Sequence, residues 1–159
     1  MAPGAQVVVA GVARAVHAQS GGRFTADAAG EGGGVGHLTY WLNKLGFTDI
    51  TYVDLPTVTI SAMYFLETNG ITDTKFVSTE DFDGKFDLVI NVDGLTQYSK
   101  MAAENYMSKI EAGTKHFMSV NREFDEFRVS DICGMRRISR NQFWLRRGYV
   151  EEDYVPENK

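Results

Sequence analysis

The chain has 159 residues, an apolar content of 43% and a formal net charge of −5. This length accommodates one domain with a buried core, and the composition is that of a folded protein rather than a disordered one. The acidic balance disfavours nucleic acid as a partner, the single cysteine excludes an internal disulfide or a cysteine-based metal cluster, and the three histidines lack ligand-like spacing, so no metal is expected.

The first 29 residues differ from the rest of the chain, since they hold a single aromatic residue, Phe24. A nucleotide-binding turn normally follows a buried strand rich in Val, Ile and Leu, whereas residues 23–29 are mostly small or polar. Residues 7–10 are apolar enough for a strand but lie far upstream of the glycine-rich turn. We therefore expect residues 1–29 to be an atypical N-terminal segment, with residues 1–22 loosely held and a short, weak first strand.

From residue 37 onward, the pattern predicts helices alternating with strands. A helix is expected from residue 37 to its stop signal at Gly46, with a buried face made of Leu38, Trp41, Leu42 and Leu45. Residues 50–54 are predicted to form a strand. Pro56 suits the first turn of a helix that ends at Asn69-Gly70 and buries Val58, Ala62 and Phe65 or Leu66. Residues 75–78 form a short predicted strand.

The second half of the chain continues the alternation. Residues 86–92 are typical of a buried strand, and Ser99 is placed to cap a helix that runs to about residue 112. The expected buried face of this helix is Ala102, Tyr106 and Ile110. Residues 116–120 form another strand, and residues 140–149 read as strand material around a turn, a terminal hairpin. The order predicts an α/β fold with a doubly wound, mostly parallel sheet.

A glycine-rich turn over residues 30–36 opens the first predicted helix, and Asp54 ends the strand that follows it. This combination is typical of an adenosine site, because glycines let the backbone approach the ligand and the acid accepts hydrogen bonds from ribose hydroxyls. The nicotinamide pattern G-x-G-x-x-G fails here, whereas G-x-G-x-G is present at Gly32, Gly34 and Gly36. The alternative interpretation is a flexible glycine-rich linker.

Four segments of the chain carry a further pattern: Gly-Gly-Gly-Val-Gly at 32–36, Val-Asp-Leu-Pro at 53–56, Phe-Asp-Leu-Val-Ile-Asn-Val-Asp at 86–93 and Ser-Val-Asn-Arg at 119–122. Together they resemble the sugar O-methyltransferase family, within the class I S-adenosylmethionine-dependent methyltransferases. The resemblance covers about residues 30–125, and the tail more weakly. It implies a Rossmann-like methyltransferase domain over residues 30–159, with S-adenosyl-L-methionine bound across the carboxyl edge of the sheet.

This resemblance implies a set of site residues. The cofactor-binding residues would be Glu31, Gly32, Gly33, Gly34, Gly36, Asp54, Leu55, Asp93 and Gly94. Methyl transfer requires an acceptor hydroxyl held in line with the methyl group, and a base helps when that hydroxyl is weakly nucleophilic. Asp93 is the candidate base, and the alternative is that it only caps the strand end or binds cofactor. The candidate substrate-binding residues are Tyr98, Asn121 and Arg122.

The region before the first glycine departs from the family pattern. The family carries an acid two residues before its first glycine, after a hydrophobic strand; here that position is Gly30, and Glu31 is displaced by one residue. A one-residue shift in a strand turns a side chain to the other face. These departures raise the hypothesis of a truncated or altered N-terminus and an impaired enzyme.

Three functions remain open from the sequence. The first is an S-adenosylmethionine-dependent O-methyltransferase acting on a sugar or similar polar hydroxyl. The second is a non-catalytic remnant of the methyltransferase fold, and the third a nicotinamide-dependent oxidoreductase. The sequence leaves the acceptor and the oligomeric state undetermined. No apolar run reaches the roughly 18 residues that span a membrane, so the expectation is a cytoplasmic protein with a small-molecule partner and no membrane partner.

Arginines are concentrated near the C-terminus. Five of them lie within 12 residues: Arg136, Arg137, Arg140, Arg146 and Arg147. Guanidinium groups bind phosphate bidentately, so a phosphorylated or nucleotide-linked sugar is one candidate partner. The alternative is a set of solvated arginines on an edge hairpin, where charge discourages further strand pairing.

Overall fold

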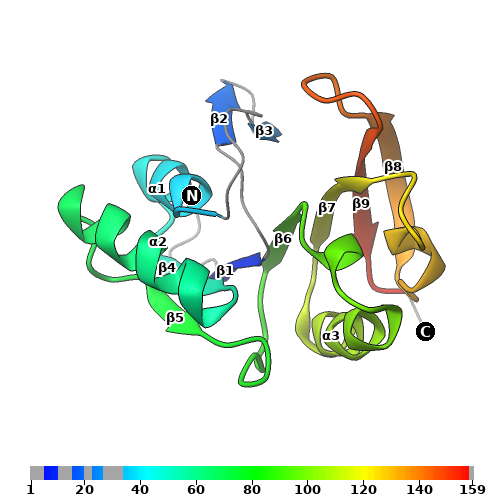
Figure 1. Cartoon of the computed structure of the whole chain (residues 1–159), viewed down its shortest axis with the longest axis horizontal. Helices are drawn as coiled ribbons and strands as arrows, with labels where there is room; N and C mark the ends of the chain where they lie inside the picture. Colours follow the sequence, from blue (N-terminus) through cyan, green and yellow to red (C-terminus); the bar gives the residue numbers. More distant parts are fainter. Residues whose placement is uncertain (1–5, 11–15, 20–22, 27–33, 158–159) are drawn as a thin grey trace.

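The computed structural model describes residues 6–10, 16–19, 23–26 and 34–157. Its core is a seven-stranded sheet in the order β5-β4-β1-β6-β7-β9-β8 (Figure 1). The strands of this sheet are β1 (Gln6–Ala10), β4 (Asp49–Val53), β5 (Lys75–Val77), β6 (Leu88–Val92), β7 (Phe117–Arg122), β8 (Arg136–Gln142) and β9 (Tyr149–Val155). The first five are parallel and the last two antiparallel, which confirms the predicted mostly parallel sheet.

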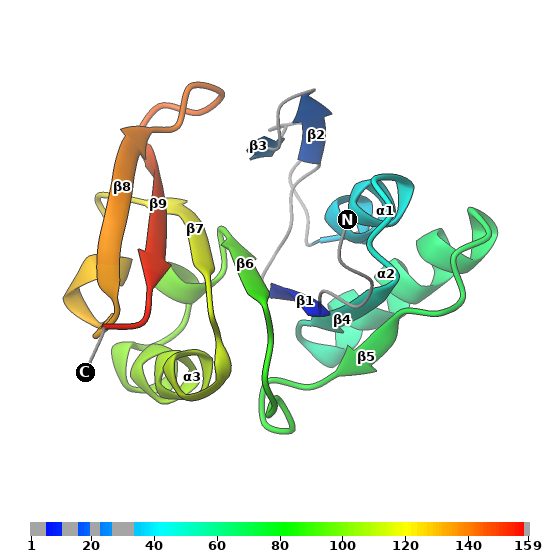
Figure 2. The same ribbon diagram turned by 180° about the vertical axis from the view of Figure 1, so that it is seen from behind.

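The central strand comes from a part of the sequence that was not expected to supply it. β1 pairs in parallel with β4 on one side, Val7 opposite Ile50, and with β6 on the other, Val7 opposite Leu88. The expectation of a first strand within residues 23–29 is therefore wrong. β3 (Arg23–Ala26) pairs with β2 (Val16–Gln19) in a separate two-stranded antiparallel sheet, drawn apart from the main sheet in Figure 2. The boundary between residues 29 and 30 stays a prediction.

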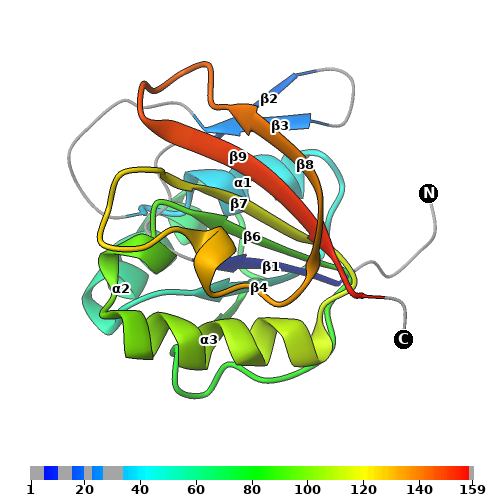
Figure 3. The same ribbon diagram turned by 90° about the vertical axis from the view of Figure 1, so that its right-hand side faces the viewer.

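Helices cover both faces of the sheet, as the doubly wound prediction requires. One core cluster joins α1 (His37–Lys44) and α2 (Pro56–Thr68) to one face, through Leu42 and Ala62. A second cluster joins α3 (Lys100–Gly113) to the opposite face, through Met107 and Ile110 (Figure 3). Since side chains alternate along a strand, β4, β6 and β7 each contribute residues to both clusters.

The predicted helix signals are found where the sequence places them. Pro56 lies at the start of α2, and the Ser99 side chain accepts a hydrogen bond from the backbone of Ala102 at the start of α3. The buried faces differ from the predicted ones at single positions. Leu45 is 43% exposed, because it follows the last turn of α1. In α3, the residue that faces the protein core is Ala103 rather than Ala102.

The C-terminal tail forms the expected hairpin. β8 and β9 pair antiparallel, and β9 pairs antiparallel with β7, so the hairpin extends the sheet at one edge. The loop between them, residues 143–148, lies at the end of β7 that carries Arg122, because Arg122 is opposite Tyr149. No helix among the described residues is long and apolar enough to cross a membrane.

Candidate cofactor site at the carboxyl edge

The carboxyl ends of the parallel strands meet at one edge of the sheet. Asp54 follows β4, Asp93 follows β6, and Asn121 lies near the end of β7. In open α/β sheets, this edge is where ligands bind. The structure therefore brings together residues that are far apart in the sequence, on the side that the resemblance indicates.

Asp54 is a buried carboxylate with a defined orientation. It is 1% exposed, and the backbone N–H of Leu55 donates to its Oδ1 at 2.7 Å. The hydroxyl of Tyr52 lies 3.1 Å from its Oδ2 and donates to the carbonyl oxygen of Gly34 at 2.7 Å. Burial raises the pKa of Asp54, while the hydrogen bond from Leu55 and the nearby Tyr52 hydroxyl act in the opposite direction. This single tyrosine thus connects the glycine turn to the acid.

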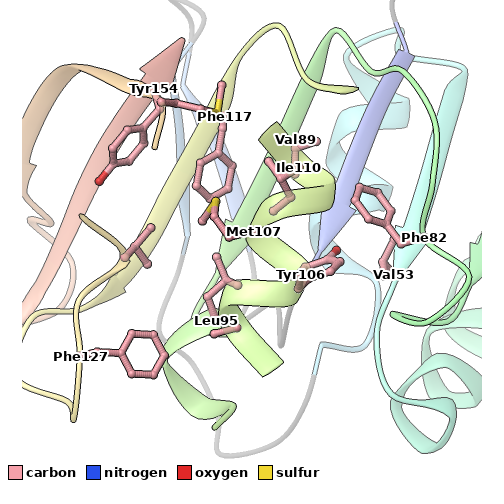
Figure 4. Close-up of a cluster of buried hydrophobic side chains, with 13 residues drawn as sticks. Val53, Phe82, Val89, Leu95, Tyr106, Met107, Ile110, Phe117, Phe127 and Tyr154 are labelled. Atoms are coloured by element: carbon pink, nitrogen blue, oxygen red, sulfur yellow. The ribbon is translucent and has the colours of Figure 1, made fainter. Parts of the chain in front are cut away.

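Two more tyrosines lie close to Asp54. Burial, followed by the negative charge of Asp54, raises the pKa of Tyr98, which is half-buried. Burial likewise raises the pKa of Tyr106, with contributions from Tyr98 and Asp54. Figure 4 shows Tyr106 beside Val53, at the end of β4. Tyr106 is 5% exposed and its hydroxyl has no hydrogen-bond partner, so a buried donor close to Asp54 is left unsatisfied.

The glycine turn is described only in part. Gly34 and Gly36 lie within the described residues, whereas the predicted cofactor residues Glu31, Gly32 and Gly33 lie outside them. Gly36 precedes α1 with a φ of 86°, a left-handed conformation that side chains rarely adopt. A Cβ built there would lie 3.1 Å from the Cγ of Leu66 on α2. Glycine is thus required at this position both by conformation and by the close approach of α2.

We expect Gly36→Ala to destabilise the fold by about 1–2 kcal/mol, because a left-handed residue with a Cβ costs that much and Leu66 must also move. Urea unfolding monitored by circular dichroism would measure it. Gly70→Ala is the matched control: it also has a positive φ, 75°, but its Cβ would meet nothing within 4 Å. A loss no greater for Gly36→Ala than for Gly70→Ala would contradict the packing argument.

Asp93, the candidate base, is already engaged. Its Oδ2 is 2.9 Å from Nη1 of Arg146, and its Oδ1 accepts a hydrogen bond of 2.7 Å from the Tyr149 hydroxyl. The guanidinium carbon of Arg146 also lies 4.1 Å from the centre of the Tyr149 ring. Asp93 is 3% exposed and has a positive φ of 54°. This pairing fits the alternative interpretation, in which Asp93 fixes the strand end, better than a base that faces an acceptor.

Asn121, a predicted substrate contact, instead holds the loop after β6. Its Nδ2 donates to Oδ1 of Asn91 at 2.8 Å and to the Ser119 hydroxyl at 2.9 Å, and its Oδ1 accepts from the backbone of Gly94 at 3.1 Å. Both amide hydrogens are used and the residue is 1% exposed. In this conformation Asn121 has no donor left for a substrate, so its evident role is to position Gly94.

The remaining predicted residues lie at the same edge with different surroundings. Leu55 is 45% exposed at the start of α2, next to Asp54. Tyr98 ends the short helix η1 (Leu95–Gln97), whose Thr96 hydroxyl is buried without a partner. Arg122 is exposed and lies 3.6 Å from Asp125. Among the described residues, no cluster of His, Cys, Asp and Glu could hold a metal ion.

Sequence reasoning missed Tyr52 and the unpartnered hydroxyl of Tyr106. Tyr52 and Asp54 are two residues apart, so the strand period alone would have placed both side chains on one face. Tyr106 was assigned to the buried face of its helix, which is correct. Its unsatisfied hydroxyl depends on the position of β4 relative to α3, which no local pattern records.

No protein-family model matches the chain, and no characterised protein matches it in sequence. Its fold resembles that of solved methyltransferases. Magnesium protoporphyrin IX methyltransferase from Synechocystis PCC 6803, solved with bound SAM, superposes with a TM-score of 0.69 at 18% identity, over 98% of this chain and 71% of that one. The 1,6-didemethyltoxoflavin-N1-methyltransferase of Burkholderia thailandensis gives 0.66 at 15%, over 97% and 72%.

Mitomycin 7-O-methyltransferase gives a TM-score of 0.65 at 13% identity, over 95% of this chain but 49% of that one. The chain thus spans about half the length of this neighbour. At such identities the likeness establishes the fold: the chain has the Rossmann-like α/β architecture of S-adenosylmethionine-dependent methyltransferases. It does not single out a sugar O-methyltransferase.

Proposed function

We propose that the protein is an S-adenosylmethionine-dependent O-methyltransferase that acts on a sugar or a similar polar hydroxyl. The observation that carries the proposal is the group around Asp54: a buried carboxylate after the second parallel strand, joined through Tyr52 to the glycine turn. The fold shared with methyltransferases solved with SAM or SAH supports the same cofactor here.

The described residues fit an adenosine. Asp54 offers acceptors for two ribose hydroxyls, and its buried charge has few competing partners, which makes such hydrogen bonds strong. The half-buried Tyr98 lies close to Asp54, where an adenine ring needs an aromatic face. Leu55 provides an apolar neighbour. These residues would hold the nucleoside, while Gly34 would line the methionine part.

The cofactor, when bound, supplies an electrophilic methyl group that an acceptor oxygen attacks by direct displacement. The protein contributes mainly alignment, which accounts for much of the rate in such reactions. Arg146 and Tyr149 both contact the carboxylate of Asp93, the residue before Gly94. Asp93 therefore holds this loop in place and is not free to act as a base. A polar hydroxyl would then lose its proton to solvent or to a group on the bound acceptor.

A sugar acceptor is supported by two exposed aromatic residues at this edge. Phe124 follows β7 and is 80% exposed, and Trp144, in the β8–β9 loop, is 67% exposed. A Cβ on Gly148 would lie 3.8 Å from the Phe124 ring, so the two loops are in contact. Aromatic faces of this kind suit the C–H faces of a sugar ring. The sugar assignment otherwise depends on the resemblance of the motifs.

The non-catalytic alternative has one observation in its favour. Asp93, the candidate base, is paired with Arg146 and Tyr149. Whether the chain binds cofactor separates the two functions, so calorimetry with S-adenosylmethionine, S-adenosylhomocysteine and NAD in parallel is the decisive experiment. Binding of the first two without NAD supports the proposal. Binding of none supports the fold remnant, and tight NAD binding supports an oxidoreductase.

A further inference from the structure

A cavity lies away from Asp54, between the β7–β9–β8 part of the sheet and the segment 123–135. Its volume is about 360 Å³, at the lower end of the roughly 300–1,000 Å³ typical of small-molecule sites. We call it the arginine pocket, and the residues that line it with charged or reactive groups are Arg122, Arg128, Arg137, Arg140, Glu123, Glu152 and Cys133.

The arginine pocket is positively charged in an acidic protein. Four arginines line it against two glutamates, whereas the whole chain carries a net charge of −5. Positive charge concentrated in a concave site attracts anions more strongly than the same charge spread over a surface. This concentration of charge in a concave site distinguishes the pocket from the solvated edge arginines of the alternative interpretation.

Glu152 orients two of the guanidinium groups. It is 3% exposed, its Oε1 lies 2.7 Å from Nη1 of Arg137 and 3.6 Å from Nε of Arg140, and its Oε2 accepts a hydrogen bond from the Tyr154 hydroxyl. Arg140 also pairs with Glu123. A guanidinium carries five N–H donors, so each arginine keeps donors beyond these contacts. The buried carboxylate of Glu152 therefore holds Arg137 and Arg140 in place and leaves some of their N–H donors free for a ligand.

The other two arginines are less engaged. Arg122 is exposed and its Nη1 lies 3.6 Å from Asp125, a long contact for an ion pair. Arg128 is exposed and its backbone N–H donates to Oδ2 of Asp131 at 2.9 Å, but among the described residues its guanidinium forms no ion pair with a carboxylate. Both side chains can therefore turn toward an anion without breaking a strong internal contact.

We propose that the arginine pocket binds the phosphate group of a small molecule. A phosphate accepts several charge-assisted hydrogen bonds at once, which matches guanidinium groups converging from β7, β8 and the segment 123–135. The volume exceeds that of the anion alone, so the ligand extends beyond its phosphate. This binding does not depend on methyl transfer and can be tested whether or not the cofactor binds.

The single cysteine of the chain provides a direct reporter. Cys133 lines the arginine pocket, and burial raises the pKa of its thiol to about 11, so modification by a thiol reagent is best followed at mildly alkaline pH. Inorganic phosphate and glucose 6-phosphate are expected to slow modification in a saturable manner, and glucose is expected to leave the rate unchanged. Equal protection by glucose, or none by either phosphate compound, would overturn the proposal.

Charge-neutralising variants test which arginines bind. We expect Arg122→Gln and Arg128→Gln each to weaken phosphate protection of Cys133 by about threefold to fivefold, the range of exposed ion pairs. Arg136→Gln is the matched control, because Arg136 lies on β8 next to the pocket-lining Arg137, is exposed and does not line the pocket. An equal loss in the control would show attraction by overall charge and overturn a defined site. S-adenosylhomocysteine binding should be measured on the same samples. Because phosphate binding does not require the cofactor, a failure of one proposal can then be told apart from a failure of the other.

Discussion

Asp54→Ala should weaken S-adenosylhomocysteine binding at least tenfold. The substitution removes a charged acceptor of hydrogen bonds, typically worth about 1.5–3 kcal/mol. The glycine turn should survive, because the Tyr52 hydroxyl keeps its 2.7 Å hydrogen bond to the Gly34 carbonyl. Calorimetry would measure the affinity. Asp49→Asn, at the opposite end of the same strand, is the control that should bind normally; unchanged affinity in Asp54→Ala would rule out the ribose role.

The Asp54→Asn variant separates binding from stability. An amide at this position can still accept from the Leu55 backbone and contact the Tyr52 hydroxyl, but it carries no charge to bury. Burial raises the pKa of Asp54 in the fold, so this group favours folding below its unfolded pKa, and that contribution is lost as pH rises through the raised value.

The ligand-free Asp54→Asn protein should therefore be more stable than the parent at neutral pH. This advantage should shrink as the pH falls toward the ordinary range of carboxyl groups. Thermal unfolding across that range would measure it. The same variant should bind S-adenosylhomocysteine more weakly. The two results together would show that the Asp54 carboxylate strengthens ligand binding but lowers the stability of the ligand-free protein. A constant difference at all pH values would contradict the burial argument.

Arg146→Gln should destabilise the protein by about 2–3 kcal/mol, because it leaves the carboxylate of Asp93 buried with one partner. The Arg146 side chain is 26% exposed, which keeps this value below that of a fully buried pair. Asp93→Asn should cost less, about 1–2 kcal/mol, since asparagine tolerates the positive φ and can still contact Tyr149.

Urea unfolding of both single variants and the double variant would give the coupling between Asp93 and Arg146. Arg147→Gln, an exposed neighbour, is the control. If Asp93 instead acts as a free base, Asp93→Asn would abolish methyl transfer while both variants kept the stability of the parent protein. The double variant thus distinguishes a structural ion pair from a catalytic carboxylate.

The sequence predicted the layered fold well because most of its signals are local. The periodicity of α1, the Pro56 start of α2 and the Ser99 cap of α3 each depend on a few neighbouring residues, and all three were confirmed. The apolar run of β6 predicted a strand buried on both faces. These features follow from short-range geometry that one sequence contains.

The central strand and the use of Asp93 were harder to predict, for a different reason. β1 is apolar, but nothing in its own residues says that it lies between β4 and β6 rather than outside them. Asp93 and Arg146 are 53 residues apart, and only the hairpin brings the arginine back over the end of β6. Both are long-range pairings, which local propensity does not encode.

The position of β1 also constrains the order in which the protein can fold as it is made. β1 is synthesised well before either of its partners: its pairing with β4 needs residues near 50, and its pairing with β6 needs residues near 90. Closing such distant contacts is slow, and an unpaired apolar strand is prone to associate with other chains. Nascent chains that stop before β6 should therefore depend on chaperones to hold Val7, Val8 and Val9 until their second neighbour is complete.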